Sequence, residues 1–268
     1  MSELLNEPSR ATPTRRRKTS VNGASDSVAD LDRLLANSPS LEDRIRQIRG
    51  AIRGRIAFAT SLGLEDQAVL HAIAATGALI DVVMLDTGRH FPETLETLSE
   101  SEHRYGLKIR MVVPDARELE ALVARDGVLG FRTSIERRRA CCEVRKVRPL
   151  VQALNGAAAW ITGLRRGQSQ ARADVPFAVW DGAHHMPKLA PLADWDADRL
   201  DAYLGANDVP VNPLHARGFP SIGCQPCTRA ILPGEDIRAG RWWWEQEDGK
   251  ECGLHPHAAP AKAAGEAA

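Results

Sequence analysis

The segment Ile56–Asp66 reads IAFATSLGLED and joins a short apolar run to a turn of small residues. Residues 56–60 have the length and composition of a buried strand, while Val69, Leu70 and Ile73 recur at helical spacing. The segment therefore predicts a strand, a tight turn and a helix. Such a junction leaves backbone N–H groups free at the positive end of a helix dipole, where an anion can bind. It matches neither the Walker A pattern nor G-x-G-x-x-G, so a plain structural turn is an equally good interpretation.

The rest of the chain repeats this alternation of apolar runs and amphipathic stretches. Strands that alternate with helices imply an α/β fold, with a mostly parallel twisted sheet and helices on both of its faces. Further strands are predicted at 80–85, 109–113 and 158–162, and 187–192 is a last strand or an extended turn. Helices are predicted as one or two within 31–52, then at 92–105, 116–125, 134–154 and 194–204, the last with Asp194 as its N-cap.

Polar residues follow three of the predicted strands. Ser61 and Gly63 come after the first strand, Asp86-Thr87-Gly88 after the second, and Arg165-Arg166 after the fourth. Ligands of open α/β sheets bind at the carboxyl ends of the strands. Small residues, a polar edge and guanidinium groups together suit a nucleotide with an anionic tail.

Four of the five cysteines lie in two tight pairs, Cys141-Cys142 and Cys224 with Cys227. A C-x2-C pair alone fits zinc, a redox dithiol or an iron-sulfur cluster. Adjacent α-carbons are only about 3.8 Å apart, so placing both neighbouring thiolates on one zinc crowds the backbone between them. A cubane offers each sulfur a different iron, so the pattern favours a 4Fe-4S cluster over zinc, disulfide chemistry or unligated core cysteines. Basic residues at 137–139 and 145–146 would favour thiolates there, unless they form a solvated helix face.

Length and composition predict a soluble, cytoplasmic chain that makes no contact with a membrane. The 268 residues are 43% hydrophobic, carry no formal net charge, and contain no apolar run long enough to span a bilayer and no signal peptide. An odd number of cysteines, two of them adjacent, argues against a secreted disulfide framework. We expect a disordered arm at 1–29, an α/β domain at 30–227, a C-terminal segment at 228–257 and a disordered tail at 258–268.

The C-terminal segment carries three further features. Trp242–Trp244 form a core plug, a partner surface or a base-stacking platform, and core or interface packing is the commonest of these uses. Arg238 and Arg241 are three residues apart and can converge on one anion. Cys252 lies beside Lys250 and His255, which could lower its pKa, so it is either a reactive thiol or an incidental one.

Taken together, these residues resemble the cluster-containing adenylylsulfate (APS) reductases of the sulfonucleotide (APS/PAPS) reductase family. The resemblance runs from Phe58 to His255. It implies an adenine nucleotide α-hydrolase-like fold, the two-electron reduction of APS to sulfite and AMP, and thioredoxin or glutaredoxin as the donor. It rests on SLGLED at 61–66, LDTG at 85–88, TGLRRGQS at 162–169, both cysteine pairs with Arg145-Lys146, and ECGLH at 251–255.

The resemblance also implies roles for particular residues. Cys252 is the nucleophile, and the other four cysteines hold one 4Fe-4S cluster per subunit. Ser61 and Gly63 bind the phosphosulfate, and Leu85 and Thr87 line the adenosine site. The positive charges that neutralise the phosphosulfate are Lys146, Arg165, Arg238 and Arg241, and His255 completes the substrate-binding set.

Three rival functions remain open from the sequence. The nearest is the same enzyme acting on the 3′-phosphorylated substrate PAPS, although family members with all four cluster cysteines use APS. A PP-loop tRNA thiolase would need the Ser-Gly-Gly-x-Asp-Ser loop, which is absent here. An iron-sulfur sensor could bind nucleic acid through 15–18, but it gives no reason for the motif at 251–255, so we predict no nucleic-acid partner. A homo-oligomer is possible.

Overall fold

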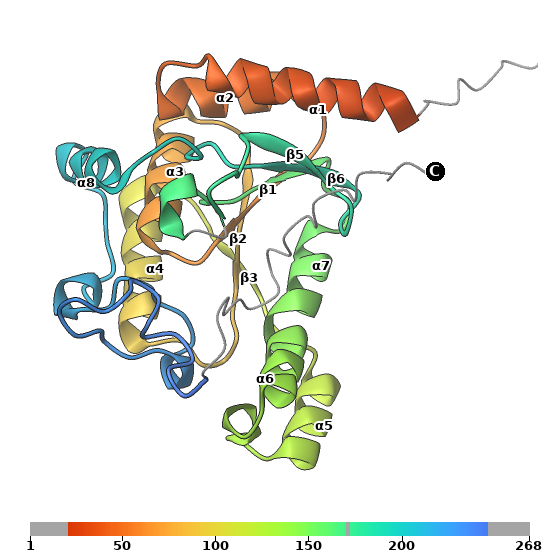
Figure 1. The fold of residues 1–268 in the computed structure, drawn as a ribbon. Helices are drawn as coiled ribbons and strands as arrows, with labels where there is room; N and C mark the ends of the chain where they lie inside the picture. The colour runs from red at the N-terminus through yellow and green to blue at the C-terminus, as the bar shows by residue number, and fades with distance from the viewer. Residues whose placement is uncertain (1–20, 170–171, 246–268) are drawn as a thin grey trace, which may run out of the picture.

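The computed structural model describes residues 21–169 and 172–245, and its centre is a six-stranded sheet (Figure 1). The strand order is β3-β2-β1-β4-β6-β5. All neighbouring strands are parallel except β5 and β6, which are antiparallel. The predicted α/β fold with a mostly parallel sheet is therefore confirmed. The strands are β1 (Ile56–Thr60), β2 (Asp81–Leu85), β3 (Arg110–Val112), β4 (Ala159–Ile161), β5 (Ala178–Asp181) and β6 (Met186–Leu189).

Helices cover both faces of the sheet, with α3, α4 and α8 on one side in Figure 1 and α5–α7 on the other. Successive β1 side chains alternate between two cores: Phe58 packs with the α3 side, and Ala57 packs against Leu150 and Leu154 of α7. The helices are α1 (Val21–Ala36), α2 (Leu41–Ala51), α3 (Leu64–Thr76), α4 (Pro92–Tyr105), α5 (Ala116–Asp126), α6 (Ile135–Cys142), α7 (Arg148–Leu154) and α8 (Ala197–Ala206).

Local chemistry sets the helix ends near the site. Helix α3 begins after Gly63 and ends at Gly77, whose φ of 62° is the left-handed conformation that glycine adopts without strain. Helix α4 begins with Pro92 and ends before Gly106, at the bounds predicted from the sequence. These ends place the start of α3 directly after β1, where the ligand site was expected.

Two local predictions were wrong. Helix α1 already begins at Val21, so 21–29 do not belong to a disordered arm, and Val28 packs into the main core. The N-cap of α8 is Asp196, whose side chain accepts a hydrogen bond from the Arg199 N–H. Asp194 instead forms an ion pair with Arg44, at 2.8 Å between Nη2 and Oδ2.

The predicted long helix 134–154 is divided by a π-helical segment at Glu143–Val147, between α6 and α7. Pro149 lies in the first turn of α7 and has no N–H to donate, and the wider π turn directly precedes it. The π segment directly follows the cysteine pair and includes Arg145 and Lys146. Its wider turn therefore sets the direction in which these two side chains extend from the helix.

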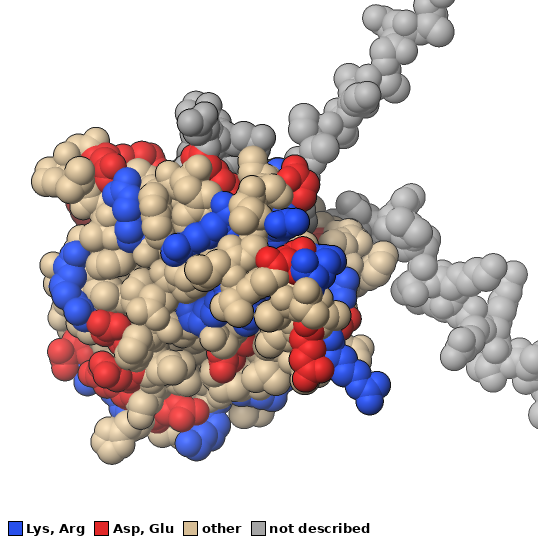
Figure 2. Space-filling view, turned by 90° about the horizontal axis from the view of Figure 1, so that it is seen from below, with Lys and Arg blue, Asp and Glu red and all other residues tan. Residues whose placement is uncertain are grey.

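The described part of the chain contains no helix long and apolar enough to cross a membrane. On the face seen in Figure 2, described side chains of both charge signs are interspersed.

Candidate functional site

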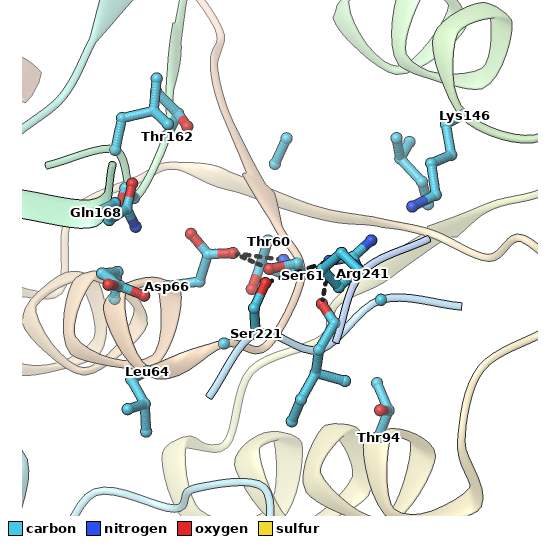
Figure 3. A pocket seen from close by; sticks show the side chains of 18 of the residues that line it. Thr60, Ser61, Leu64, Asp66, Thr94, Lys146, Thr162, Gln168, Ser221 and Arg241 are labelled. Atoms are coloured by element: carbon cyan, nitrogen blue, oxygen red, sulfur yellow. Dashed lines mark hydrogen bonds between the residues drawn. The ribbon is translucent and has the colours of Figure 1, made fainter. Parts of the chain in front are cut away.

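The main cavity, of about 240 Å³, lies at the carboxyl ends of β1, β2 and β4 (Figure 3). Its walls come from the β1–α3 turn, the segments that follow β2 and β4, the π segment, and the chain after α8. All the predicted substrate residues that the structure describes line it: Ser61, Gly63, Leu85, Thr87, Lys146, Arg165, Arg238 and Arg241. His255 and Cys252 lie outside the described residues.

Three cations line the cavity, Lys146 from the π segment and Arg238 and Arg241 from one segment near the end of the described chain, and we call them the cationic end. Arg241 is held in place because its Nη1 donates to the Ile222 carbonyl at 3.2 Å. An added Cβ at Gly223 would lie 2.1 Å from Arg241 Nη2, so any other residue there would displace the guanidinium from its present position. Arg241 Nε is buried and has no hydrogen-bond partner among the described residues. The cationic end can therefore take an anionic group.

The β1–α3 turn is already hydrogen bonded to one of its own carboxylates. The backbone N–H and the hydroxyl of Ser61 both donate to Asp66 Oδ2, at 2.6 Å each. Leu62, which follows Ser61 in this turn, has a positive φ of 58°. Burial raises the pKa of Asp66 to about 6, although the bonds from Ser61 favour its charged form. The predicted phosphosulfate donors of Ser61 are thus engaged by Asp66 in this structure.

The raised pKa of Asp66 predicts a specific pH dependence of stability. Because the folded protein holds this proton more tightly than the unfolded chain does, the free energy of unfolding falls as pH rises between the ordinary pKa of 3.8 and about 6. Relative to Asp66→Asn, wild type should lose about 1 kcal/mol of stability between about pH 5 and pH 7. Urea unfolding of both proteins at several pH values measures this difference, and a constant difference would contradict the assignment.

Arg165 also has a partner within the protein. Its Nε donates to Glu65 Oε1 at 2.8 Å, and the side chains are 7% and 19% exposed. The Arg165 backbone N–H donates to Gln168 Oε1 at 3.2 Å, which ties the β4 loop together. Arg165 lines the cavity as predicted, but its charge is offset by Glu65.

Thr87 connects the nucleotide cavity to the cysteines. Its hydroxyl oxygen lies 3.3 Å from Cys224 Sγ, and its carbonyl accepts a hydrogen bond from Arg145. Gly88, with a φ of 66°, follows it and lets the chain turn away from the sheet. The loop after β2 therefore contacts both predicted centres.

The four paired cysteines line one second cavity, next to the first. Lys146, Arg241 and Trp242 line both cavities, so two of the three residues of the cationic end belong to the wall between them. The cysteines come from the end of α6 and from the turn at 224–227, which lie 81 residues apart in sequence and pack together with Phe131 and Trp242. The predicted convergence of the two cysteine pairs is therefore present.

The thiols differ in their electrostatic surroundings. Burial raises the pKa of Cys141 and raises that of Cys227 to about 12. Burial alone would also raise the pKa of Cys224, but the Lys146 charge and the contact with Thr87 help to bring it below the ordinary thiol value. The charge of Lys146, which lines both cavities, thus favours the thiolate form of Cys224.

The residues around this cavity fit an anionic iron-sulfur cluster. Arg89 Nη1 and Arg145 Nε are buried N–H donors without a hydrogen-bond partner in the described part of the chain, and both residues line the cavity. Burial and the neighbouring Arg89 charge lower the pKa of Arg145, as expected for cations gathered without a matching anion. No three Cys, His, Asp or Glu side chains within 21–169 and 172–245 converge as ligands of a single metal ion.

Only the first of the three tryptophans is a core plug. Trp242 is 1% exposed, and two guanidinium groups lie against its ring, with Cζ of Arg138 at 4.5 Å and Cζ of Arg241 at 4.9 Å from the ring centroid. Arg138 in turn forms a buried ion pair with Glu245, at 2.8 Å. Trp243 is 39% exposed. Trp242 thus belongs to the wall of the cysteine cavity, and this confirms the packing interpretation for that residue.

Several cavity residues were not assigned a role from the sequence. Asp66 and Gln168 lay inside quoted motifs, and Glu65 lies beside Asp66, so their positions were visible but their partners were not. Thr94 and Ser221 lie on segments without a motif. No local signal identifies such residues, because only the fold brings these segments to the strand ends.

Several known proteins are similar to this chain. Residues 55–230 match the family model described as the phosphoadenosine phosphosulfate reductase domain. An adenosine 5′-phosphosulfate reductase of Agrobacterium fabrum is 51% identical over 236 residues, which are 88% of this chain and 90% of the relative. One of Rhizobium tropici is 55% identical over 179 residues, covering 67% of this chain and 99% of the relative.

Among solved structures, a phosphoadenylyl-sulfate reductase from Candida auris has the same fold. Its TM-score is 0.64 at 24% identity, with 76% of this chain and 96% of that chain covered. The shared fold, the extent of the domain match and the identity to the bacterial relatives agree with one another. The chain therefore belongs to the phosphoadenosine phosphosulfate (APS/PAPS) reductase family.

Proposed function

We propose that this protein reduces APS to sulfite and AMP with electrons from a dithiol protein, thioredoxin or glutaredoxin. The observation that carries the proposal is the wall between a nucleotide-sized cavity and the convergent cysteines, to which Lys146 and Arg241 of the cationic end belong. The relatives named as adenosine 5′-phosphosulfate reductases, at about 50% identity, support APS as the substrate. PAPS reduction by the same mechanism is the second candidate.

The proposed chemistry runs through Cys252. Its thiolate attacks the sulfuryl sulfur of APS, a sulfur–sulfur bond forms, and the sulfur–oxygen bond to phosphate breaks, so that AMP leaves. A thiolate of the donor then attacks the Cys252 sulfur, and sulfite departs with the electron pair of the sulfur–sulfur bond. The second donor thiol resolves the mixed disulfide. Two thiols are oxidised to one disulfide for each sulfite released.

The described residues would orient the substrate for this attack. Lys146, Arg238 and Arg241 bind the phosphosulfate and stabilise charge on the departing phosphate. Leu85 and Thr87 contact the adenosine at the carboxyl end of β2. This arrangement directs the sulfate toward the wall that the two cavities share.

Cys141, Cys142, Cys224 and Cys227 would hold one 4Fe-4S cluster in each subunit. When bound, the cluster would join the end of α6 to the turn at 224–227 and add its charge to the field near the sulfate. Lys146, on the wall between the cavities, would transmit that field to the substrate site. The two donor thiols supply both electrons of the reaction, so the proposed cycle needs no electron transfer through the cluster.

The proposed cycle sets conditions on the surroundings of the protein. It consumes reduced dithiols, which the cytoplasm maintains, and we therefore propose a cytoplasmic enzyme of sulfate assimilation. If the other four cysteines bind iron, Cys252 has no resolving cysteine in this chain, so the resolving thiol must come from the donor.

Turnover on the two nucleotides tests the function directly. With reduced thioredoxin, the anaerobically purified protein should form sulfite and AMP from APS in equal amounts, and it should use PAPS much more slowly. Absence of sulfite from APS with thioredoxin, glutaredoxin and glutathione alike would overturn the proposal. A higher kcat/KM with PAPS would establish the second candidate.

Neutralising the cationic end should weaken APS binding far more than AMP binding. Each charge-assisted contact contributes roughly 1.5 to 3 kcal/mol, so Lys146→Ala, Arg238→Ala and Arg241→Ala should each lower APS affinity by about 10- to 100-fold. Calorimetric titration of APS and AMP into each variant, made in a Cys252→Ser background so that APS is not consumed, measures the difference. Equal losses for both ligands would place these cations away from the sulfate.

A further inference from the structure

The last residues that the structure describes, 240–245, are held against the second cysteine pair, and we call them the base of the C-terminal segment. The Arg229 N–H donates to the Gly240 carbonyl at 3.0 Å, and the Trp242 N–H donates to the Cys227 carbonyl at 3.2 Å. An added Cβ at Gly240 would lie 2.3 Å from the Arg229 carbonyl oxygen, so the two backbones could not approach as closely with any other residue. The base therefore packs on the segment that carries the second cysteine pair.

The base turns sharply at Trp242. Its φ is 44°, a conformation that a bulky residue rarely adopts. The Glu245 N–H donates to the Trp242 carbonyl at 2.9 Å and closes the turn, while the guanidinium groups of Arg138 and Arg241 lie against the ring. A strained backbone persists where its surroundings determine it. The path of the base is therefore set by its contacts and not by local preference.

Arg138 joins the base to α6, the helix that carries the first cysteine pair. Its Nε donates to Glu245 Oε1 at 2.8 Å, and its Nη2 donates to Glu245 Oε2 at 3.0 Å. The two side chains are 3% and 4% exposed. Arg138 and Cys142 are four residues apart in α6, so they share a face of the helix, and both line the cysteine cavity. The base is thus bonded to both of the segments that carry the paired cysteines.

Stability alone is a weak reason for a buried pair of this kind. Two buried charges lose their hydration, and apolar side chains of similar volume often stabilise a protein as well as a buried ion pair does. Two parallel bonds between a planar guanidinium and a carboxylate, however, fix an orientation as well as a distance. The bonds between Arg138 and Glu245 therefore define the direction in which the chain continues after Glu245.

The proposed nucleophile lies a short way along the chain from this point. Cys252 is seven residues beyond Glu245, and an extended chain spans at most about 3.6 Å for each residue, so its Cα lies within about 25 Å of that of Glu245. Arg241, which belongs to the cationic end, is four residues before Glu245. The anion site and the anchor of the nucleophile are therefore parts of one short stretch of chain.

We propose that Arg138 and Glu245 are positioning residues, which fix the point and the direction from which the chain brings Cys252 to the bound substrate. Neither of these two described residues lines the nucleotide cavity, so the pair acts on the attack by Cys252 and not on substrate binding. The inference rests on the proposed function, because it takes Cys252 as the nucleophile.

A single turnover without reductant tests the inference. In Glu245→Gln, sulfonate should form on Cys252 at saturating APS about tenfold or more slowly than in wild type, because the attacking group is misdirected. The base would still be bonded at Trp242, so the free chain would grow from seven to ten residues. That extra length alone lowers the effective concentration of the thiol by less than about twofold. A larger loss therefore reports direction, and rapid quenching followed by mass spectrometry measures it.

A small thiol reagent separates positioning from thiol reactivity. Iodoacetamide needs no bound orientation, so in Glu245→Gln it should alkylate Cys252 at a rate within about twofold of wild type. Iron content should be unchanged, and so should APS affinity, measured in a Cys252→Ser background. Equal losses of sulfonation and alkylation would assign the effect to the reactivity of the thiol and would overturn the inference.

Two further variants complete the test. Arg138→Met combined with Glu245→Leu leaves no lone buried charge, so it keeps the inference testable if Glu245→Gln fails to fold, and its sulfonation should also be slow. Glu235→Gln is the matched control. It breaks the two bonds from Arg229 to Glu235, at 2.8 Å each, in the same C-terminal segment but before the base, and Glu235 lines neither described cavity. It should keep the wild-type rate.

The outcomes distinguish failure of the inference from failure of the function. A wild type that forms no sulfonate on Cys252 would overturn the proposed function and this inference with it. A wild type that forms it, together with a folded, iron-loaded double variant whose rate is within twofold of wild type, would overturn the inference alone. A loss in Glu235→Gln as large as that in Glu245→Gln would also overturn it, since any broken pair in the segment would then slow the attack.

Discussion

Cys252→Ser should lose sulfite formation by at least about a thousandfold while keeping wild-type iron content and APS affinity, because a hydroxyl is a poor nucleophile at neutral pH. The predicted substrate residues within 21–245 line one described cavity, and the four clustered cysteines line the cavity next to it. Cys252 belongs to neither set, so its replacement should change the chemical step and leave both sets in place. Sulfite assays, iron analysis and calorimetry on the same preparation measure all three properties.

The sulfonate intermediate can be trapped by withholding the reductant. Wild type mixed with APS alone should gain one sulfonate, located by mass spectrometry on the peptide that contains Cys252, and should release about one equivalent of AMP. A thioredoxin that lacks its resolving cysteine should stop as a disulfide with Cys252. A sulfonate on another cysteine, or AMP release by Cys252→Ser at the wild-type rate, would rule out this mechanism.

Much of the fold could be predicted because its signals are local. The strand at Ile56–Thr60 and the helix Pro92–Tyr105 occur at their predicted bounds, since an apolar run, a proline and a glycine fix them within a few residues. Strand β5 was missed because only Ala178 of its four residues is buried, which leaves no clear alternation. Helix α1 was set to begin too late because the polar composition of 21–29 obscured its amphipathic face.

The sequence predicted many of the residues that line the site, but not which of their side chains bond to one another. Strand ends and clustered cations indicated Ser61, Arg165 and Arg241 as binding residues, and the resemblance to a known family added Lys146; all four line the cavity. The bond between Arg165 and Glu65 joins residues 100 positions apart, so no local pattern could indicate it. Sequence alone therefore counted Arg165 as a free charge for the phosphosulfate, whereas the fold shows that this charge is already offset.

The cluster assignment predicts that serine at any one of Cys141, Cys142, Cys224 and Cys227 removes the iron. The four thiols come from two segments that meet only at this cavity, and a site with three thiolates should be labile. Each variant should lose its visible absorption and its activity together. Iron analysis and absorption spectra of anaerobically purified protein measure the loss, and Cys252→Ser, the same substitution outside the ligand set, is the matched control.

The four variants should also lose stability, because the cluster would join the end of α6 to the turn at 224–227. Arg89 and Arg145 would then be left as buried cations without the anionic group that their free N–H donors face. The thermal midpoint should therefore fall in all four cluster variants but not in Cys252→Ser. Full iron occupancy in two or more of the cluster variants would refute the ligand set. Iron loss without any change in the thermal midpoint would refute the structural role of the cluster and leave the ligands standing, so the two measurements separate the two claims.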